Sequence, residues 1–246
     1  FPYHDREGWT ARIGQGRVLA NGKRPTPDRV LELGDTVEYL ASDIPEPKVD
    51  VDVGVVFDDD DIMVVNKPGN LPCHPGGRFF NHTLWAVLKE RFGLEEPTFV
   101  NRLDRETSGL VVVAKTAEAA KRCRSQFSSR RVEKRYVVLV EGPFPETLEA
   151  KGYLVEDPDL YPGKRQLFKP GEWKREMMEG DIWSDTRFRR IATHGGITEV
   201  EVIPSTGRLH QIRATLCSLG HPVVGDKMYG ADPTVFARFC NGTMTD

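Results

Sequence analysis

The chain has 246 residues, of which 39% are hydrophobic and 29% are charged, and its formal net charge is −3. This length fits one large domain, or one domain with a small appendage, and allows a sizeable core. No apolar run approaches the roughly 20 residues of a membrane-spanning helix. The first residues have neither the basic start nor the apolar stretch of a signal peptide. We expect a soluble cytoplasmic protein and, since residue 1 is Phe, a piece of a longer chain.

The four cysteines lie far apart, and no pair has the close spacing of a zinc site. The six histidines form no HExxH or similar pattern. We therefore expect reduced thiols and no bound metal.

Residues 1–42 are expected to form a small separate unit. Apolar and polar residues alternate there around Asn21-Gly22, a pair that strongly indicates a tight turn. The run resembles the second half of an S4-type RNA-binding domain, although most of the expected first helix is missing. A degenerate structural appendage is the alternative. The Pro-rich, acidic residues 43–52 are expected to be a linker.

Two apolar runs, 53–57 and 62–65, flank four consecutive aspartates and predict a hairpin with an exposed turn. The sequence Lys67-Pro68-Gly69 ends the second strand. Residues 83–92 then place apolar side chains on one face of a predicted helix.

The stretch 99–116, FVNRLDRETSGLVVVAKT, joins a charged loop to an apolar run. Residues 110–114 are β-branched or apolar and predict a buried strand. The loop before it places Asp104 between Arg102 and Arg105, and nearby cations favour an ionised carboxylate. Such a group suits a nucleophile or an electrostatic stabiliser. The alternative is a solvated turn with a surface ion pair of little energetic weight.

Beyond this stretch the pattern predicts a second helix capped by Thr116, buried strands at 136–140 and 198–204, and a helix over 208–219 that ends before Gly220. Between Arg102 and Arg135 there are ten basic residues and four acidic ones. A local basic face of this kind suits phosphate contacts whatever the total charge. The alternative is that these Lys and Arg residues line an exposed helix face without contacting phosphate.

Three motifs occur in order: NRLDRETSGLVVVAK (101–115), KRYVVLVEG (134–142) and TGRLHQIRATLCSLGHPVVGDKMYG (206–230). They resemble the HRLDxxTSGLLLxAK, K/R-x-Y and GRxHQIRxHLxxxGHPIxGDxxYG motifs of the RluA-type pseudouridine synthases. The segment from Asn66 to Pro75 is similar to the NKPxGLxxHP run of that family. The resemblance covers roughly residues 50–230.

The resemblance implies an α+β fold: a mixed, mainly antiparallel sheet with flanking helices and a central active-site cleft. The catalytic domain would span residues 53–246. After Gly230 the chain departs from the family pattern, so we expect its C-terminal end to be incomplete. The implied reaction isomerises uridine to pseudouridine in RNA. It conserves atoms and redox state, so no cofactor is expected.

The resemblance also implies roles for single residues. Asp104 would be the catalytic carboxylate, acting on C1′, on the pyrimidine ring or on a ribose proton. Arg213 would be its basic partner, and Tyr136 would stack on the target uracil. Arg102 would help to hold the flipped nucleotide. The other candidate substrate contacts are Arg105, Lys67, His74, Arg208 and His210. A structural role is at least as expected for Lys67 and His74, and Arg208 and His210 are expected chiefly to build the start of the helix.

Asn101 is the clearest departure, because His is common at this place. A non-catalytic RNA-binding protein of the same fold is the main alternative. A glycoside or nucleoside hydrolase is a third hypothesis, but it would use a pair of carboxylates, and only Asp104 lies in a motif. The expected partner is ribosomal or transfer RNA, with small nuclear RNA open; a monomer without membrane contact is favoured.

Overall fold

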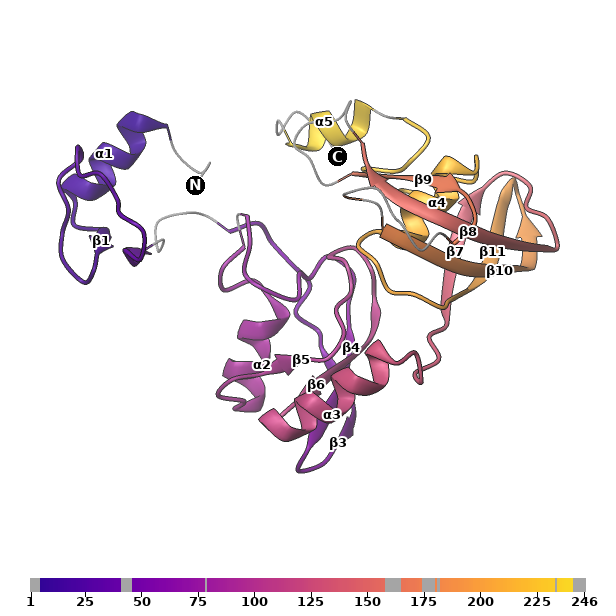
Figure 1. Ribbon diagram of the computed structural model, residues 1–246, viewed down its shortest axis with the longest axis horizontal. Coiled ribbons are helices and arrows are strands. Elements are labelled where there is room, and N and C mark those ends of the chain that lie inside the picture. The colour runs from indigo at the N-terminus through magenta and orange to yellow at the C-terminus, as the bar shows by residue number, and fades with distance from the viewer. Residues whose placement is uncertain are drawn as a thin grey trace. The chain divides into compact units, whose positions relative to one another are not determined.

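The computed structural model describes residues 5–40, 46–77, 79–157, 165–173, 180, 182–232 and 234–240. The chain divides into two compact units, residues 1–124 and 125–246 (Figure 1). Each unit contains an antiparallel sheet with its own buried core. Within these described ranges, no helix is long and apolar enough to cross a membrane.

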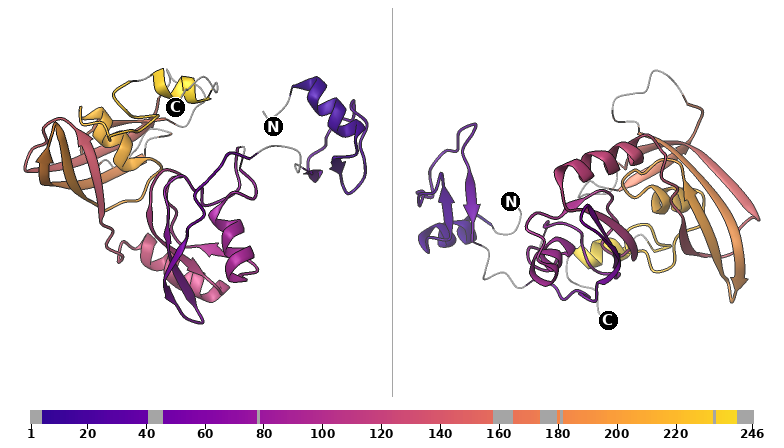
Figure 2. Two further views of the ribbon diagram at one scale, coloured as in Figure 1. Left: turned by 180° about the vertical axis from the view of Figure 1, so that it is seen from behind. Right: turned by 90° about the horizontal axis from the view of Figure 1, so that it is seen from below.

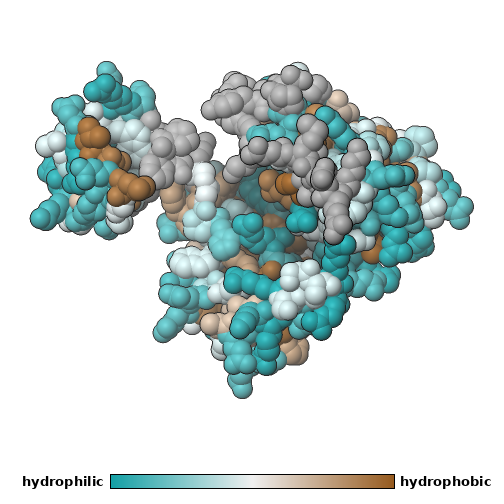
Figure 3. Space-filling view, viewed as in Figure 1, coloured by the Kyte–Doolittle hydropathy of each residue, from teal (hydrophilic) through white to brown (hydrophobic). Residues whose placement is uncertain are grey.

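The N-terminal part of the first unit comprises α1 (Arg6–Gly14) and the antiparallel strands β1 (Val18–Ala20) and β2 (Val37–Tyr39). The predicted turn after β1 is confirmed, because Asn21 (φ 53°) and Gly22 (φ 71°) both adopt the left-handed conformation. The core here is small. Figure 3 shows apolar surface on this part, where Val30 and Leu33 are exposed.

The rest of the first unit contains a four-stranded sheet in the order β3-β4-β6-β5, with all pairs antiparallel. Its elements are β3 (Gly54–Asp58), β4 (Ile62–Lys67), α2 (Leu84–Phe92), β5 (Thr98–Phe99), β6 (Gly109–Ala114) and α3 (Ala117–Ser128). The predicted hairpin is β3–β4. One face of the sheet packs with α2, so that Val65, Leu88 and Val111 are fully buried.

Local capping explains where the two helices begin. The Thr83 hydroxyl accepts a hydrogen bond from the Ala86 amide (3.2 Å), and α2 ends at Gly93 in the left-handed conformation. The Thr116 hydroxyl accepts from the Ala119 amide (3.1 Å) at the start of α3. Both helices predicted from the sequence in this unit are confirmed.

The second unit contains a five-stranded antiparallel sheet in the order β7-β11-β10-β8-β9. Its elements are β7 (Tyr136–Glu141), β8 (Thr147–Glu156), β9 (Gln166–Pro170), β10 (Ile182–His194), β11 (Ile197–Pro204), α4 (Gln211–Ser218) and α5 (Thr234–Cys240). Figure 2 shows α4 against one face of this sheet. Ala214 and Leu216 of α4 share a core cluster with Val140 and Val200.

The predicted α+β class with mainly antiparallel sheets is confirmed, but three details differ. The helix predicted from residue 208 begins at Gln211, because His210 is in the left-handed conformation (φ 54°). Leu110 in β6 is 57% exposed, although the sequence predicted a buried strand. Strand β7 alternates between inward and exposed residues instead of being buried throughout. The predicted boundary at residues 43–52 stays a prediction, and residues 241–246, where we expected an incomplete end, lie outside the described residues.

Candidate active site

The Asp104 loop connects β5 to β6, and its backbone is held by the segment 67–73. The Leu103 carbonyl accepts a hydrogen bond from the Cys73 thiol (3.4 Å). The Arg105 carbonyl accepts from the Leu71 amide (3.1 Å), and the Asp104 carbonyl accepts from the Thr107 amide (3.1 Å). Three consecutive carbonyls therefore have fixed partners, which restricts the conformations available to the Asp104 backbone.

Lys67, at the end of β4, is fully buried. Its ammonium donates to the carbonyls of Pro68 (2.8 Å), Leu71 (2.8 Å) and Arg105 (3.1 Å). Burial lowers the pKa of Lys67 to about 8, an effect that nearby Asp104 partly opposes. Because all three ammonium protons are donated inside the protein, the structural role fits Lys67 better than the RNA contact we had considered.

Three further predicted residues lie on the same two segments. Arg102 and His74 are both exposed, and the His74 ring lies edge-on to Phe99 (4.6 Å between centroids). Partial burial and the charge of Arg102 lower the pKa of His74, which favours its neutral imidazole. The Arg105 guanidinium pairs with Glu106 (2.7 Å). The structure thus gathers Asp104 and its four predicted neighbours in the first unit around one loop.

Asn101 begins this loop and uses its whole side-chain amide. The carbonyl oxygen accepts from the Val112 amide (2.8 Å), and the amide nitrogen donates to the Leu110 carbonyl (3.2 Å). These bonds continue along β6 the pairing that β5 begins at Phe99. Asn101 therefore anchors the loop to the strand, a role that its short side chain with one acceptor and one donor group fits.

In the second unit, Tyr136 is the first residue of β7, opposite Val202 of β11. Its side chain is half-buried and packs against the core cluster that contains Ala214 and Leu216 of α4. The Tyr136 side chain is therefore held by packing against the core of the second unit.

Gln211 fixes the start of α4 on the sheet. Its side-chain oxygen accepts from the Thr206 hydroxyl (2.8 Å) and the Arg208 amide (3.0 Å), while its nitrogen donates to the Thr186 hydroxyl (2.9 Å). The side chain is buried with each of these groups satisfied. Gln211 is not among the site residues predicted from the sequence; the available signal is its position before the apolar Ile212 within HQIR.

Arg213 forms a bidentate ion pair with Asp226, with N–O distances of 2.6 and 2.9 Å. Burial opposes ionisation of Asp226, yet the Arg213 pair and backbone amides hold the pKa of this carboxyl below its usual value. The Arg213 guanidinium also lies over the buried ring of Tyr229 (5.0 Å), whose pKa burial raises to about 12. His210 Nδ1 lies 3.0 Å from the Tyr229 hydroxyl.

The predicted site residues therefore form two groups, each ordered within its own unit. Asp104 belongs to the first unit; Tyr136 and Arg213 belong to the second. The ion pair predicted between Arg213 and Asp104 stays a prediction, as does the stacking role of Tyr136. Asp226 also accepts from the Met228 and Tyr229 amides (both 2.9 Å), so its carboxylate joins Arg213 to the turn after α4.

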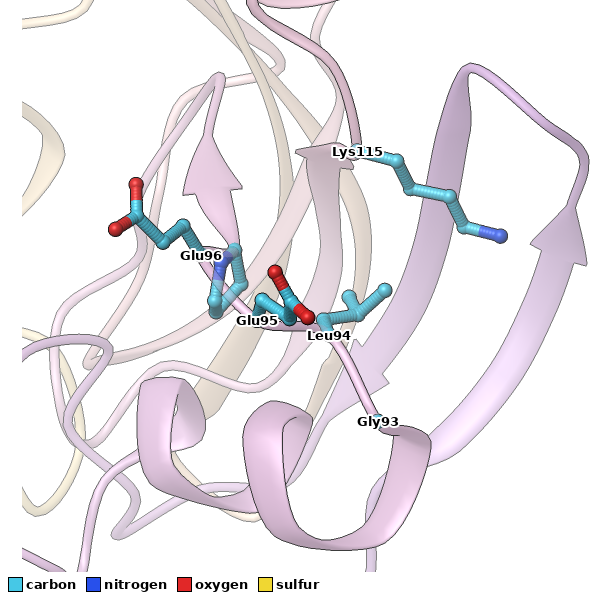
Figure 4. A pocket seen from close by; sticks show the side chains of 6 residues that line it. Gly93, Leu94, Glu95, Glu96 and Lys115 are labelled. Carbon is cyan, nitrogen blue, oxygen red and sulfur yellow. The ribbon is translucent and has the colours of Figure 1, made fainter.

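A surface pocket of about 350 Å³ in the first unit contains none of the predicted site residues (Figure 4). Its lining includes Glu95, Glu96 and Lys115, and Lys115 pairs with Asp58 (2.6 Å). Across the parts of the chain that the structure describes, no three His, Cys, Asp or Glu side chains are grouped to hold a metal ion.

Comparison with known proteins identifies the family. The family model described as RNA pseudouridylate synthase matches residues 61–218. A mitochondrial tRNA pseudouridine(32) synthase of Saccharomyces cerevisiae is 35% identical over 237 residues, covering 94% of this chain and 49% of the relative. An uncharacterized RNA pseudouridine synthase of Aquifex aeolicus is 33% identical over 246 residues, covering 94% of this chain and 74% of the relative.

Among solved structures, the human RNA pseudouridylate synthase domain containing 1 protein matches with a TM-score of 0.61 and 27% identity. That match covers 76% of this chain and 73% of the human chain. This chain spans about half the length of the yeast relative. The extent of the family match and the identity to the Aquifex protein establish that the chain belongs to the RNA pseudouridylate synthase family.

Proposed function

We propose that this protein isomerises uridine to pseudouridine within RNA. The N1–C1′ glycosidic bond breaks, the base turns, and a C5–C1′ bond forms. The proton on C5 passes to solvent and N1 gains a proton, so atoms and charge balance. The observation that supports this most directly is the Asp104 loop, whose three carbonyls are held by the 67–73 segment and by the loop itself. Such preorganisation holds a carboxylate where it can act on a bound nucleotide.

Asp104 is the catalytic carboxylate in this proposal, and all three routes remain open: attack on C1′, attack on the ring, and removal of a ribose proton. Arg213 is its charged partner. The bidentate pair with Asp226 supports this role, because it fixes the orientation of the guanidinium. Tyr136 stacks on the target uracil, and the packing of its side chain against the core of the second unit limits its movement.

The target uridine must leave its stack to reach Asp104, at a cost of about a few kcal/mol. Arg102 is exposed beside Asp104 and suits the task of holding the displaced nucleotide or its phosphate. Arg208 and His210 lie at the start of α4, beside Arg213, and are the corresponding substrate contacts of the second unit. We propose structured RNA, ribosomal or transfer RNA, as the substrate; the name of the yeast relative favours transfer RNA.

Product analysis separates this function from the alternatives. The protein is incubated with RNA labelled in the uracil ring with ¹⁴C, and nucleosides and free bases are resolved by chromatography. Pseudouridine in the recovered RNA supports the proposal. Free uracil would instead indicate a hydrolase. RNA binding without either product, over ribosomal and transfer RNA pools, would indicate a binding protein that retains only the fold.

A further inference from the structure

Three aromatic side chains of the second unit lie together on a part of the surface that the proposed catalytic residues do not use. We call Tyr153, Trp173 and Trp183 the aromatic patch. The rings of Tyr153 and Trp183 meet edge to face with 5.3 Å between centroids, and those of Trp173 and Trp183 with 5.5 Å. Trp173 is 59% exposed. An indole that is this exposed, and that packs against the ring of Trp183, offers a surface on which another ring can stack.

The strand register explains why the patch is ordered. Trp183 of β10 lies opposite Tyr153 of β8, which lies opposite Lys169 of β9. The three side chains therefore form one cross-strand row on one face of the sheet. The Tyr153 hydroxyl donates to the Glu172 carbonyl (2.9 Å), which ties the residue before Trp173 to the sheet.

Cations surround the patch. Lys169 is exposed at the end of the row, and Arg208 Nε donates to the Trp183 carbonyl (3.4 Å). Lys134 contacts the Thr206 carbonyl (2.8 Å), and its pKa is lowered by burial and by the charges of Arg130 and Arg208. Cations that lower one another's pKa in this way mark a local positive potential.

The carboxylates along the same face are opposed by cations. Asp185 lies opposite Lys151, and Glu149 lies opposite Arg187, in the next two rows of the sheet. Among the described residues, Lys169 and Arg208 outweigh the exposed Glu172 beside Trp173, so the charge excess at the patch is positive.

We propose that the aromatic patch binds unpaired nucleotides that flank the target uridine. A base would stack on Trp173, and Lys169 and Arg208 would contact the adjoining phosphates. Aromatic faces combined with cations are the general chemistry of single-stranded RNA recognition. A duplex hides its base faces, so the patch favours unpaired RNA. This inference rests on the proposed RNA-directed function and deepens it.

The patch lies too far from Tyr136 to contact the same base. Tyr136 is aligned through Val202 with Phe188 of β10, five residues after Trp183. At about 3.3 Å per residue, this separates the two aromatic sites by roughly 16 Å along the strand. An odd number of residues also places them on opposite faces of the sheet. The patch therefore holds a neighbouring segment of RNA while the target uridine lies elsewhere.

The test compares Trp173→Ala, Trp173→Phe and Lys169→Ala with the unchanged full chain. Leu139→Ala is the matched control, because it removes a 49% exposed apolar side chain from the same sheet. Affinity is measured for fluorescently labelled 12-nucleotide oligo(U) and for its duplex with oligo(A), each at several salt concentrations. Tritium release from C5-labelled tRNA is measured for every variant.

We expect Trp173→Ala to weaken oligo(U) binding by roughly 5- to 150-fold, as for other bases stacked on aromatic residues. Trp173→Phe should recover most of the affinity, and duplex binding should not change. The slope of log affinity for oligo(U) against log salt concentration should stay the same in Trp173→Ala but become shallower by about 0.7 in Lys169→Ala. In the release assay, Trp173→Ala should raise KM with little change in kcat.

Equal oligo(U) affinity for Trp173→Ala, Leu139→Ala and the unchanged protein overturns the inference. Equal weakening of duplex and oligo(U) binding also overturns it. These outcomes differ from a failure of the proposed function, in which the unchanged protein releases no tritium. They also differ from misfolding, which the circular dichroism spectrum of each variant would reveal.

Discussion

Replacing Lys67 by Met tests whether a buried ammonium holds the Asp104 loop. The substitution keeps an unbranched side chain but removes three donated hydrogen bonds. The Arg105 carbonyl keeps the Leu71 amide, so the Pro68 and Leu71 carbonyls lose their Lys67 partner. Each such loss costs about 1–3 kcal/mol. Against this, the lowering of the Lys67 pKa from 10.5 to about 8 represents about 3 kcal/mol of burial cost that Met avoids.

At pH 7 these contributions largely offset each other, and we expect Lys67→Met to change the free energy of unfolding by between a gain of about 1 kcal/mol and a loss of about 3 kcal/mol. The sign of the pH dependence follows from the lowered pKa. Between pH 8 and 10.5 the unfolded chain binds more protons at Lys67 than the folded chain, so the stability of the unchanged protein rises with pH. Met does not titrate. The stability difference should widen by about 1.4 kcal/mol per pH unit above pH 8.

Urea unfolding of both proteins at pH 7, 8, 9 and 9.5 measures this difference, and Lys121→Met, exposed on α3, is the matched control. A difference that stays constant over this range would refute the account of a buried, titrating ammonium. If Lys67→Met does not fold, the titration of the Lys67 Cε signal in the unchanged protein, followed by NMR, tests the same pKa directly.

Two further substitutions test the contacts that hold Arg213 and the start of α4 in the second unit. Asp226→Asn leaves the half-buried Arg213 guanidinium without its charged partner and should lower the free energy of unfolding by about 2–4 kcal/mol. Because the Asp226 pKa is lowered in the folded state, the unchanged protein should lose this advantage as the pH falls through and below the usual carboxyl range. Acid unfolding curves of both proteins measure this loss. Gln211→Leu leaves the Thr206 hydroxyl and the Arg208 amide without their Gln211 partner and should lower the free energy of unfolding by about 2–3 kcal/mol. In steady-state assays the same substitution should lower kcat more than substrate affinity.

The elements with regular patterns could be predicted from the sequence. Thr83 and Thr116 fit the N-cap positions of α2 and α3, and Asn21-Gly22 fits the left-handed turn after β1. These signals are local, because each depends on one side chain and the few residues beside it. The local charge pattern indicates Asp104 as a candidate carboxylate, whereas Tyr136 and Arg213 follow only from the motif resemblance, because no local propensity would select them.

The rest depends on contacts between residues distant in sequence. Lys67 is a typical surface residue by type, and only the fold places its ammonium against the Arg105 carbonyl. Gln211 is buried because β10 presents Thr186 to it, 25 residues away in sequence. The start of α4 at Gln211, three residues later than predicted, has the same cause, since the left-handed His210 contacts the distant Tyr229 hydroxyl (3.0 Å). Composition and periodicity contain no information on such pairings.

The central claim is that Asp104 performs the isomerisation, and tritium release from RNA labelled at uridine C5 tests it most directly. The unchanged protein, Asp104→Asn and the control Asp60→Asn, which alters an exposed carboxylate between β3 and β4, are compared on the same tRNA and rRNA pools. The account predicts release by the unchanged protein and by Asp60→Asn, and none by Asp104→Asn. Equal release by all three proteins would contradict the assignment of Asp104.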